Sequence, residues 1–325
     1  MKEEFIGHQR EWNFLQAALT NGRLAQAYLF FGPEGIGKKQ LALKLAQAVN
    51  CSSSESPPCR SCPSCKKLDK HSHPDVTIIC PDGNQIKIDQ IRRLQRDLMF
   101  APLEGKRKFY IMDDADTMTI EAANCLLKAL EEPPGYVTII LVASNPSLLP
   151  STILSRCQRL RFLPLKLEEV ARLLATQGCD PEQARLLAAI SEASPARALK
   201  LKEGGMLEET EEFMTRAIAG PPLNTQEVLA YSQRWARSDY DTKDLMRILL
   251  LWIRDLLALK EGVSQEQLFY RGQLNTMKAG AGNWSRDRLI ELGDEINRID
   301  SALDRNVNRQ LAFDVLLRQI GCQRC

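Results

Sequence analysis

Residues 27–39, AYLFFGPEGIGKK, join an apolar run to a glycine-rich loop, and this stretch decides the predicted fold. The run Tyr28–Phe31 is short and apolar throughout, which predicts a strand that is buried on both faces. The loop Gly32–Lys39 follows directly and leads into an amphipathic helix that carries Leu41 and Leu45. This order is the one that a phosphate-binding loop requires, because turned backbone N–H groups and a helix N-terminus together attract phosphate oxygens.

Three further apolar runs continue this alternation of strands and helices as far as Phe162. They are Val76–Ile79, Phe109–Met112 and Val137–Val142. None of them alternates with polar residues, as expected of strands that are covered by helices on both faces. The sequence therefore predicts an α/β domain built on a doubly wound parallel sheet.

Strand signals end after Pro164, and the rest of the chain is predicted to be helical. Short helices are interrupted at residues 178–181 and at Ser194-Pro195. Beyond Gly204-Gly205, further amphipathic helices continue to the C-terminus. We therefore predict three domains: an α/β domain at residues 1–163, a small helical domain at 164–204 and an all-helical domain at 205–325.

The overall composition limits the kind of protein. The 325 residues include 43 Lys and Arg against 41 Asp and Glu, so a formal net charge of +2 gives no composition-level case for nucleic-acid binding. The N-terminus has no apolar leader, and the most apolar stretch, residues 245–259, is broken by Arg247, Arg254 and Asp255. Neither secretion nor membrane crossing is predicted, and we expect a cytoplasmic location.

The glycine loop departs from the usual pattern at its last position. Lys38 is placed to reach the β and γ phosphates of a nucleotide, but Lys39 stands where a Ser or Thr hydroxyl would ligate Mg²⁺. An ammonium group cannot ligate a cation, so MgATP is expected to bind less well whether Lys39 points inward or outward. A vestigial loop that binds neither ATP nor ADP is the alternative. The candidate nucleotide-binding residues of the loop are Gly32, Gly35, Ile36, Gly37, Lys38 and Lys39.

A second acidic site follows the predicted strand Phe109–Met112, at the edge where open α/β sheets bind ligands. Asp113 is a candidate for holding Mg²⁺ through water. Asp114 stands where a Glu usually orients the attacking water, and its shorter side chain places the carboxylate about 1 Å away, an error that can cost ~10²-fold in rate. The alternative is that these carboxylates only cap a helix that starts near Thr117.

Four cysteines, Cys51, Cys59, Cys62 and Cys65, are separated by seven, two and two residues. Four thiolates at such intervals can close a tetrahedron around Zn²⁺, so residues 51–65 are a candidate zinc module. An iron–sulfur cluster is disfavoured because the x₃-C-P continuation of ferredoxins is absent, and four unligated thiols remain the alternative. The terminal pair, Cys322 and Cys325, is expected to lie in an unstructured reduced tail.

The segment Leu149–Arg159, LPSTILSRCQR, carries the closest resemblance to a known family. Its Ser155-Arg156-Cys157 triplet resembles the arginine-finger motif of the AAA+-type bacterial clamp-loader subunits. Residues 126–134 and 27–30 are similar to the same family, and together the similar segments cover most of residues 5–200. The resemblance implies that residues 164–204 form a lid and that residues 205–325 form a collar that oligomerises.

The resemblance also implies roles for three residues. Arg156 would act in trans as an arginine finger, Asn145 would be sensor 1, and Arg197 in Ser194–Leu199 would be sensor 2. The residues themselves leave simpler alternatives open: a surface cation for Arg156, a turn residue before Pro146 for Asn145, and a packing or ion-pair residue for Arg197.

Two sub-types of the family share this fold, the ATP-hydrolysing gamma/tau motors and the delta-prime subunits. Lys39, Asp114 and the lack of a long C-terminal extension favour delta-prime, with weak or absent ATPase of its own; a gamma/tau motor is the alternative. The partners implied are the gamma/tau and delta subunits, the sliding clamp and primer-template DNA, within the DNA polymerase III holoenzyme, a nucleotidyltransferase. An unrelated P-loop ATPase or helicase that acts alone is a further alternative.

Overall fold

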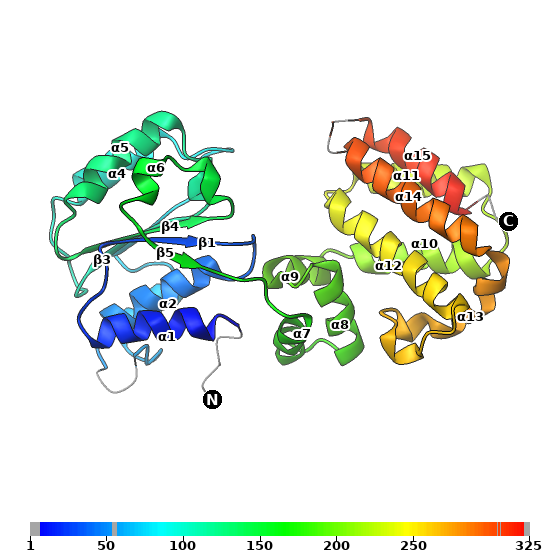
Figure 1. The fold of residues 1–325 in the computed structure, drawn as a ribbon, viewed down its shortest axis with the longest axis horizontal. Helices are drawn as coiled ribbons and strands as arrows, with labels where there is room; N and C mark the ends of the chain where they lie inside the picture. Colours follow the sequence, from blue (N-terminus) through cyan, green and yellow to red (C-terminus); the bar gives the residue numbers. More distant parts are fainter. Residues whose placement is uncertain (1–6, 54–56, 304, 306, 322–325) are drawn as a thin grey trace. The chain divides into compact units, whose positions relative to one another are not determined.

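The computed structural model of the chain describes residues 7–53, 57–303, 305 and 307–321. The chain forms two compact units, Met1–Leu165 and Lys166–Cys325 (Figure 1). The first unit holds every described strand, and all regular secondary structure described in the second unit is helical. The predicted division of the helical part at residue 204 falls inside the second unit and stays a prediction.

The first unit is built on a five-stranded sheet with the order β2-β3-β4-β1-β5, in which all four pairings are parallel. The first four strands in the chain confirm the predicted apolar runs, and β3 and β4 are buried along their whole length. The fifth strand was not predicted. The strands are β1 Ala27–Phe31, β2 Val76–Ile79, β3 Lys108–Met112, β4 Val137–Ala143 and β5 Gln158–Arg161.

Helices cover both faces of this sheet, which confirms the doubly wound α/β fold: α4, α5 and α6 lie on one face, and α1 and α2 on the other (Figure 1). Residues 115–117 and 146–148 form single 3₁₀ turns. The α-helices of this unit are α1 Gln9–Thr20, α2 Lys38–Asn50, α3 Pro63–Asp69, α4 Ile88–Asp97, α5 Ile120–Glu131 and α6 Ser151–Leu154.

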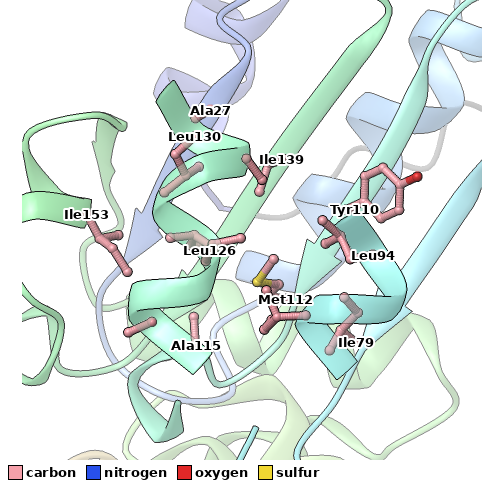
Figure 2. Close-up of a cluster of buried hydrophobic side chains, with 14 of the residues drawn as sticks. Ala27, Ile79, Leu94, Tyr110, Met112, Ala115, Leu126, Leu130, Ile139 and Ile153 are labelled. Carbon is pink, nitrogen blue, oxygen red and sulfur yellow. The ribbon is translucent and has the colours of Figure 1, made fainter. Parts of the chain in front are cut away.

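The core on one face of the sheet is a cluster of aliphatic and aromatic side chains. Figure 2 shows Leu94 of α4 and Leu126 of α5 pointing toward Tyr110, Met112 and Ile139 of the central strands. Burying one leucine side chain stabilises a fold by roughly 2 kcal/mol. This packing fixes the carboxyl ends of β1, β3 and β4 relative to one another, and the candidate site lies at those ends.

The second unit consists of nine described α-helices with three short 3₁₀ turns between them. The chain leaves the helical conformation between α7 and α8, at the predicted interruption of residues 178–181. There the Asp180 side chain accepts hydrogen bonds from the backbone N–H groups of Glu182 and Gln183 and caps the start of α8. No helix among the described residues is long and apolar enough to span a membrane. The helices are α7 Leu167–Thr176, α8 Pro181–Ile190, α9 Pro195–Glu203, α10 Met206–Ala219, α11 Thr225–Arg237, α12 Thr242–Lys260, α13 Leu274–Gly280, α14 Arg286–Leu303 and α15 Arg309–Gly321.

Candidate functional site

The glycine loop lies between the carboxyl end of β1 and the first turn of α2. Gly32, Gly35 and Gly37 have φ angles of 149°, 71° and 103°, in a region that residues with a Cβ atom rarely adopt. At Gly32 a Cβ atom would also lie 2.3 Å from the carbonyl oxygen of Phe162. The loop therefore depends on glycine, and it presents the N-terminus of α2 at the edge where α/β sheets bind ligands.

Lys38 is folded into this loop and is only 5% exposed. Its Nζ donates to the carbonyl oxygens of Gly32, at 2.7 Å, and of Pro33, at 2.5 Å. Burial lowers the pKa of Lys38, although nearby carboxylates, Asp116 first among them, oppose that shift. Behind the loop, His8 Nε2 donates to the carbonyl oxygen of the buried Ile36 at 2.9 Å. The loop is thus held in shape by contacts of its own chain.

Lys39 points toward the acidic end of β3. Its Nζ lies 2.9 Å from Asp113 Oδ2, and 4.0 Å from the Sγ of Cys80, which follows β2. Burial lowers the pKa of Lys39, but the hydrogen bond and the charge of Asp113 outweigh burial and leave the pKa above its ordinary value. The sequence left open whether the Lys39 side chain points into the loop site or away from it, and in the structure it points inward. The ammonium group is therefore charged and is bonded to the carboxylate that was expected to hold Mg²⁺.

The other acidic residues of the site differ in their surroundings. Burial and the negative charges of Asp113 and Asp116 raise the pKa of Asp114, whose backbone φ is 50°. Asp116 Oδ2 accepts hydrogen bonds from the backbone N–H groups of Ser144, at 3.0 Å, and Asn145, at 2.7 Å. Asp116 thus fixes the segment after β4 to the segment after β3, a role that the sequence analysis did not assign.

Asn145 lies at this junction and caps the 3₁₀ turn that follows it. Its Oδ1 accepts hydrogen bonds from the backbone N–H of Ser147, at 3.1 Å, and from the Ser147 hydroxyl, at 2.6 Å. Asn145 is therefore the turn residue before Pro146 that the sequence allowed as the simpler interpretation. A role as sensor 1 stays a prediction.

Arg156 follows the short helix α6, and its side chain is 35% exposed. One terminal nitrogen lies 2.7 Å from Glu131 Oε1 at the end of α5, and the other donates to the carbonyl oxygen of Thr152 at 2.9 Å. The neighbouring Cys157 is buried, and burial raises the pKa of its thiol to about 12. The triplet is therefore anchored by Cys157, while Arg156 stays at the surface. Sequence analysis did not identify Glu131 as the partner of Arg156.

Arg197 lies in the first turn of α9, in the second unit, and forms ion pairs with carboxylates of that unit. It bonds to the buried Asp244 of α12 and lies 3.8 Å from Glu192, which also pairs with Arg247 at 2.6 Å. These ion pairs tie α9 to α12. A role for Arg197 as sensor 2 stays a prediction.

The four cysteines converge into one group, with every Sγ atom within 4.8 Å of the others. A tetrahedral zinc site with Zn–S bonds of about 2.3 Å would place its sulfur atoms about 3.8 Å apart, and Cys59 Sγ and Cys65 Sγ are 4.0 Å apart. Cys51 ends α2, while Cys62 and Cys65 belong to the start of α3. The arrangement forms a four-cysteine group that can hold a metal ion. Cys322 and Cys325 lie outside the described residues.

Hydrogen bonds favour the thiolate form of Cys59 and Cys62, whereas burial and the hydrogen bond to Cys62 raise the pKa of Cys65. Backbone N–H groups of Ser53 and Cys59 donate to Cys51 Sγ, and that of Cys62 donates to Cys59 Sγ, all at 3.4 Å. Hydrogen bonds, that from the Ser61 hydroxyl first among them, lower the pKa of Cys59 to about 5. Because the thiolate is the form that binds a metal, this pattern suits the group to a cation.

Matches to known protein families agree with this architecture. Residues 7–166 match the family model described as DNA polymerase III, delta subunit, and residues 207–321 match the one described as DNA polymerase III, delta subunit, C terminal. The chain belongs to the family of DNA polymerase III clamp-loader subunits. The family resemblance expected from the segment around Arg156 is thereby confirmed.

Within this family the chain is similar to delta' subunits. It is 33% identical over 318 residues to the DNA polymerase III subunit delta' of Bacillus subtilis, in an alignment that covers 96% of each chain. It is also 27% identical over 346 residues to subunit tau of that organism, and this alignment covers 99% of the present chain and 61% of tau. A gamma subunit-related protein of Thermotoga maritima is 22% identical, with a TM-score of 0.43 over 94% of this chain and 98% of that one.

Proposed function

We propose that the chain is the stator-like delta' subunit of a bacterial clamp loader, which supplies Arg156 to the ATP site of a neighbouring subunit and hydrolyses little or no ATP itself. The observation that carries the proposal is the contrast between two cations. Lys39 is bonded to Asp113, whose side chain is 22% exposed, inside the chain's own candidate phosphate site, whereas Arg156 is bonded to Glu131, whose side chain is 49% exposed. The Lys39 ammonium group opposes metal binding at the chain's own loop, and the Arg156 guanidinium group is accessible to a partner subunit.

The contacts of Arg156 suit a transfer to a neighbour's triphosphate. Its partner Glu131 is 49% exposed, and such surface ion pairs contribute only about 0–1 kcal/mol. A γ-phosphoryl group carries more negative charge than a carboxylate, and a planar guanidinium group with five N–H donors suits phosphate oxygens. Arg156 would therefore exchange Glu131 for the γ-phosphoryl group and offset the charge that develops there during hydrolysis.

The test is DNA-stimulated ATP hydrolysis by the reconstituted complex, with this chain carrying Arg156→Ala. Removal of an arginine finger lowers the rate by roughly 10³- to 10⁵-fold at the site that it serves, while the complex should still assemble. Arg159→Ala is the matched control, because Arg159 lies on the same segment and bonds only weakly to the carbonyl oxygen of Leu154, at 3.4 Å. Equal rates for the wild-type chain and Arg156→Ala would contradict the proposal.

A gamma/tau-type motor is the second candidate, because the glycine loop is preformed with Lys38 inside it and the similarity to tau spans 99% of the chain. The two candidates differ in what the isolated chain does with ATP. A motor hydrolyses ATP alone and loses this activity on Lys38→Ala. The proposed stator binds ATP or ADP weakly at most and shows no turnover that depends on Lys38.

We further propose that residues 164–204 act as a lid and residues 205–325 as a collar, which joins the chain to gamma/tau and delta subunits for loading a sliding clamp onto primer-template DNA. Leu311 and Val315, one helical turn apart on α15, are 60% and 43% exposed, and such an apolar pair suits a helix–helix contact. Leu311→Asp should lower the mass of the complex in native mass spectrometry, whereas Arg318→Ala on the same helix should leave it unchanged.

The four-cysteine group is proposed to hold Zn²⁺ through Cys51, Cys59, Cys62 and Cys65. Zinc favours four sulfur ligands at tetrahedral spacing, and the module has few apolar side chains with which to order itself. Elemental analysis of purified protein should give about one zinc per chain, and Cys62→Ser should lower that content. Cys80→Ser is the matched control, because Cys80 is exposed and lies outside the group. A folded chain without metal would contradict this assignment.

A further inference from the structure

The ion pair between Lys39 and Asp113 lies where a phosphate-loop site ordinarily holds its metal. In such sites Mg²⁺ bridges a hydroxyl from the residue after the loop lysine and a carboxylate at the end of a neighbouring strand. Here those two positions are Lys39 and Asp113, and they are joined directly at 2.9 Å. The residues present therefore do not fit Mg²⁺. We propose that the Lys39 ammonium group replaces Mg²⁺, so that the loop is closed to metal-bound nucleotides.

Both ends of this ion pair are fixed by the fold. Lys39 belongs to the first turn of α2, whose start is set by the glycine loop. The backbone N–H of Asp113 donates to the carbonyl oxygen of Ile79 at 2.9 Å, which holds the carboxylate at the edge of the sheet. The two side chains are 30% and 22% exposed, respectively. The contact therefore follows from the placement of α2 against the sheet and not from the chance meeting of two long surface side chains.

The charges of the site explain why a cation is kept there. Four carboxylates, those of Asp116, Asp114, Glu34 and Asp113, act on Lys38, and their negative charges oppose the lowering of its pKa by burial without overcoming it. Without Lys39, Asp113 would face the other carboxylates with no bonded cation. Lys39 thus supplies the positive charge that Mg²⁺ supplies in an active phosphate loop, but it offers no oxygen ligand and no vacant coordination position.

Magnesium faces two separate obstacles, which can be tested separately. The first is the lost ligand, because Mg²⁺ demands near-octahedral oxygen coordination and an ammonium group offers none. The second is repulsion, because the metal would have to displace a charged group from Asp113 and then lie beside it. Lys39→Ala removes the repulsion alone, whereas Lys39→Thr removes the repulsion and restores the hydroxyl ligand.

The experiment measures the affinity of the isolated chain for a fluorescent ATP analogue, mant-ATP, in MgCl₂ and in EDTA. For the wild-type chain, Mg²⁺ should produce no gain in affinity. Changing even an indirect partner of a metal ligand alters metal affinity roughly 10- to 100-fold. Lys39→Thr should therefore bind mant-ATP at least about tenfold more tightly with Mg²⁺ than without it. Lys39→Ala should gain less, and the double variant Lys39→Thr, Asp113→Asn should lose the gain.

Either of two results would overturn the inference: tighter binding by the wild-type chain with Mg²⁺, or no effect of Mg²⁺ on folded Lys39→Thr. Circular dichroism checks the fold of each variant. Should Lys39→Thr fail to fold, the inference is tested by electron paramagnetic resonance of Mn²⁺ mixed with ATP and the wild-type chain. Protein-bound Mn²⁺ would contradict the inference, and the absence of protein-bound Mn²⁺ would support it. The inference concerns the chain's own loop and not Arg156. It can therefore fail while Arg156 still acts in the complex, and it can hold while Arg156 has no such action.

Discussion

The phosphate loop and the Arg156 segment use the same pairing, a cation on a carboxylate, with opposite consequences. Lys39 bonds to Asp113 between two elements fixed by the sheet, so the pair belongs to the chain's own candidate nucleotide site. Arg156 bonds to Glu131 at the ends of two helices, and both side chains stay at least one-third exposed. Under the proposed function, placement, and not the chemistry of the pair, separates a cation that would close a site from one that would be available to a neighbour.

Charge reversal at the exposed pair should have the largest effect. Arg156→Glu removes the guanidinium group and sets a carboxylate against the neighbour's γ-phosphoryl group, so we expect a loss of at least roughly 10³-fold in ATP hydrolysis at that site. The exchange Arg156→Glu with Glu131→Arg restores an ion pair within the chain, and hydrolysis should stay low. Recovery of hydrolysis by the exchange would show that Arg156 serves only a structural pair.

Repair of the closed site should have an intermediate effect. Lys39→Thr alone restores a metal ligand but leaves the short Asp114 where a longer carboxylate is needed to reach the attacking water. Adding Asp114→Glu should raise ATP turnover by the isolated chain by up to ~10²-fold over Lys39→Thr. The measurement is release of inorganic phosphate. Appreciable ATP turnover by the isolated wild-type chain that is lost on Lys38→Ala would contradict the account, because the chain's own loop would then be an active ATP site.

The smallest effect is expected from Glu131→Gln. This change removes the charge that holds Arg156 but keeps a hydrogen-bond acceptor, and a surface pair of this kind contributes about 0–1 kcal/mol. The free energy of unfolding, measured with urea, should fall by less than about 1 kcal/mol, and the ATPase of the complex should not decrease. A large loss of ATPase activity would mean that Glu131 positions Arg156 for its action on the neighbouring site and does not merely bind it in the absence of a partner.

The sequence predicted the sheet well because its central strands are buried on both faces and are mostly apolar, with Lys108 and Thr138 as the exceptions in β3 and β4. It did not predict β5, Gln158–Arg161, because this edge strand is polar and pairs only with β1, so neither periodicity nor an apolar run marks it. Edge position and parallel pairing are properties of the assembled sheet. They become visible only when strands far apart in the chain lie side by side.

The candidate site was predictable in its residue types but not in its pairings. The motifs named Lys39, Asp113 and Arg156, but the direction of Lys39 depends on how the first turn of α2 lies against β3, 74 residues away. Glu131 as the partner of Arg156 and Asp116 as the anchor of the segment after β4 also depend on tertiary contacts. Spacing along the chain succeeds for the cysteines because their ligand group is nearly local.

The most direct test of the central contrast is single-turnover, DNA-stimulated ATP hydrolysis by the complex reconstituted with this chain as wild type, Lys38→Ala or Arg156→Ala. The account predicts that Lys38→Ala leaves rate and amplitude unchanged, because the chain's own loop contributes no turnover, while Arg156→Ala abolishes fast hydrolysis at one neighbouring site. Loss of hydrolysis on Lys38→Ala together with normal hydrolysis on Arg156→Ala would contradict it.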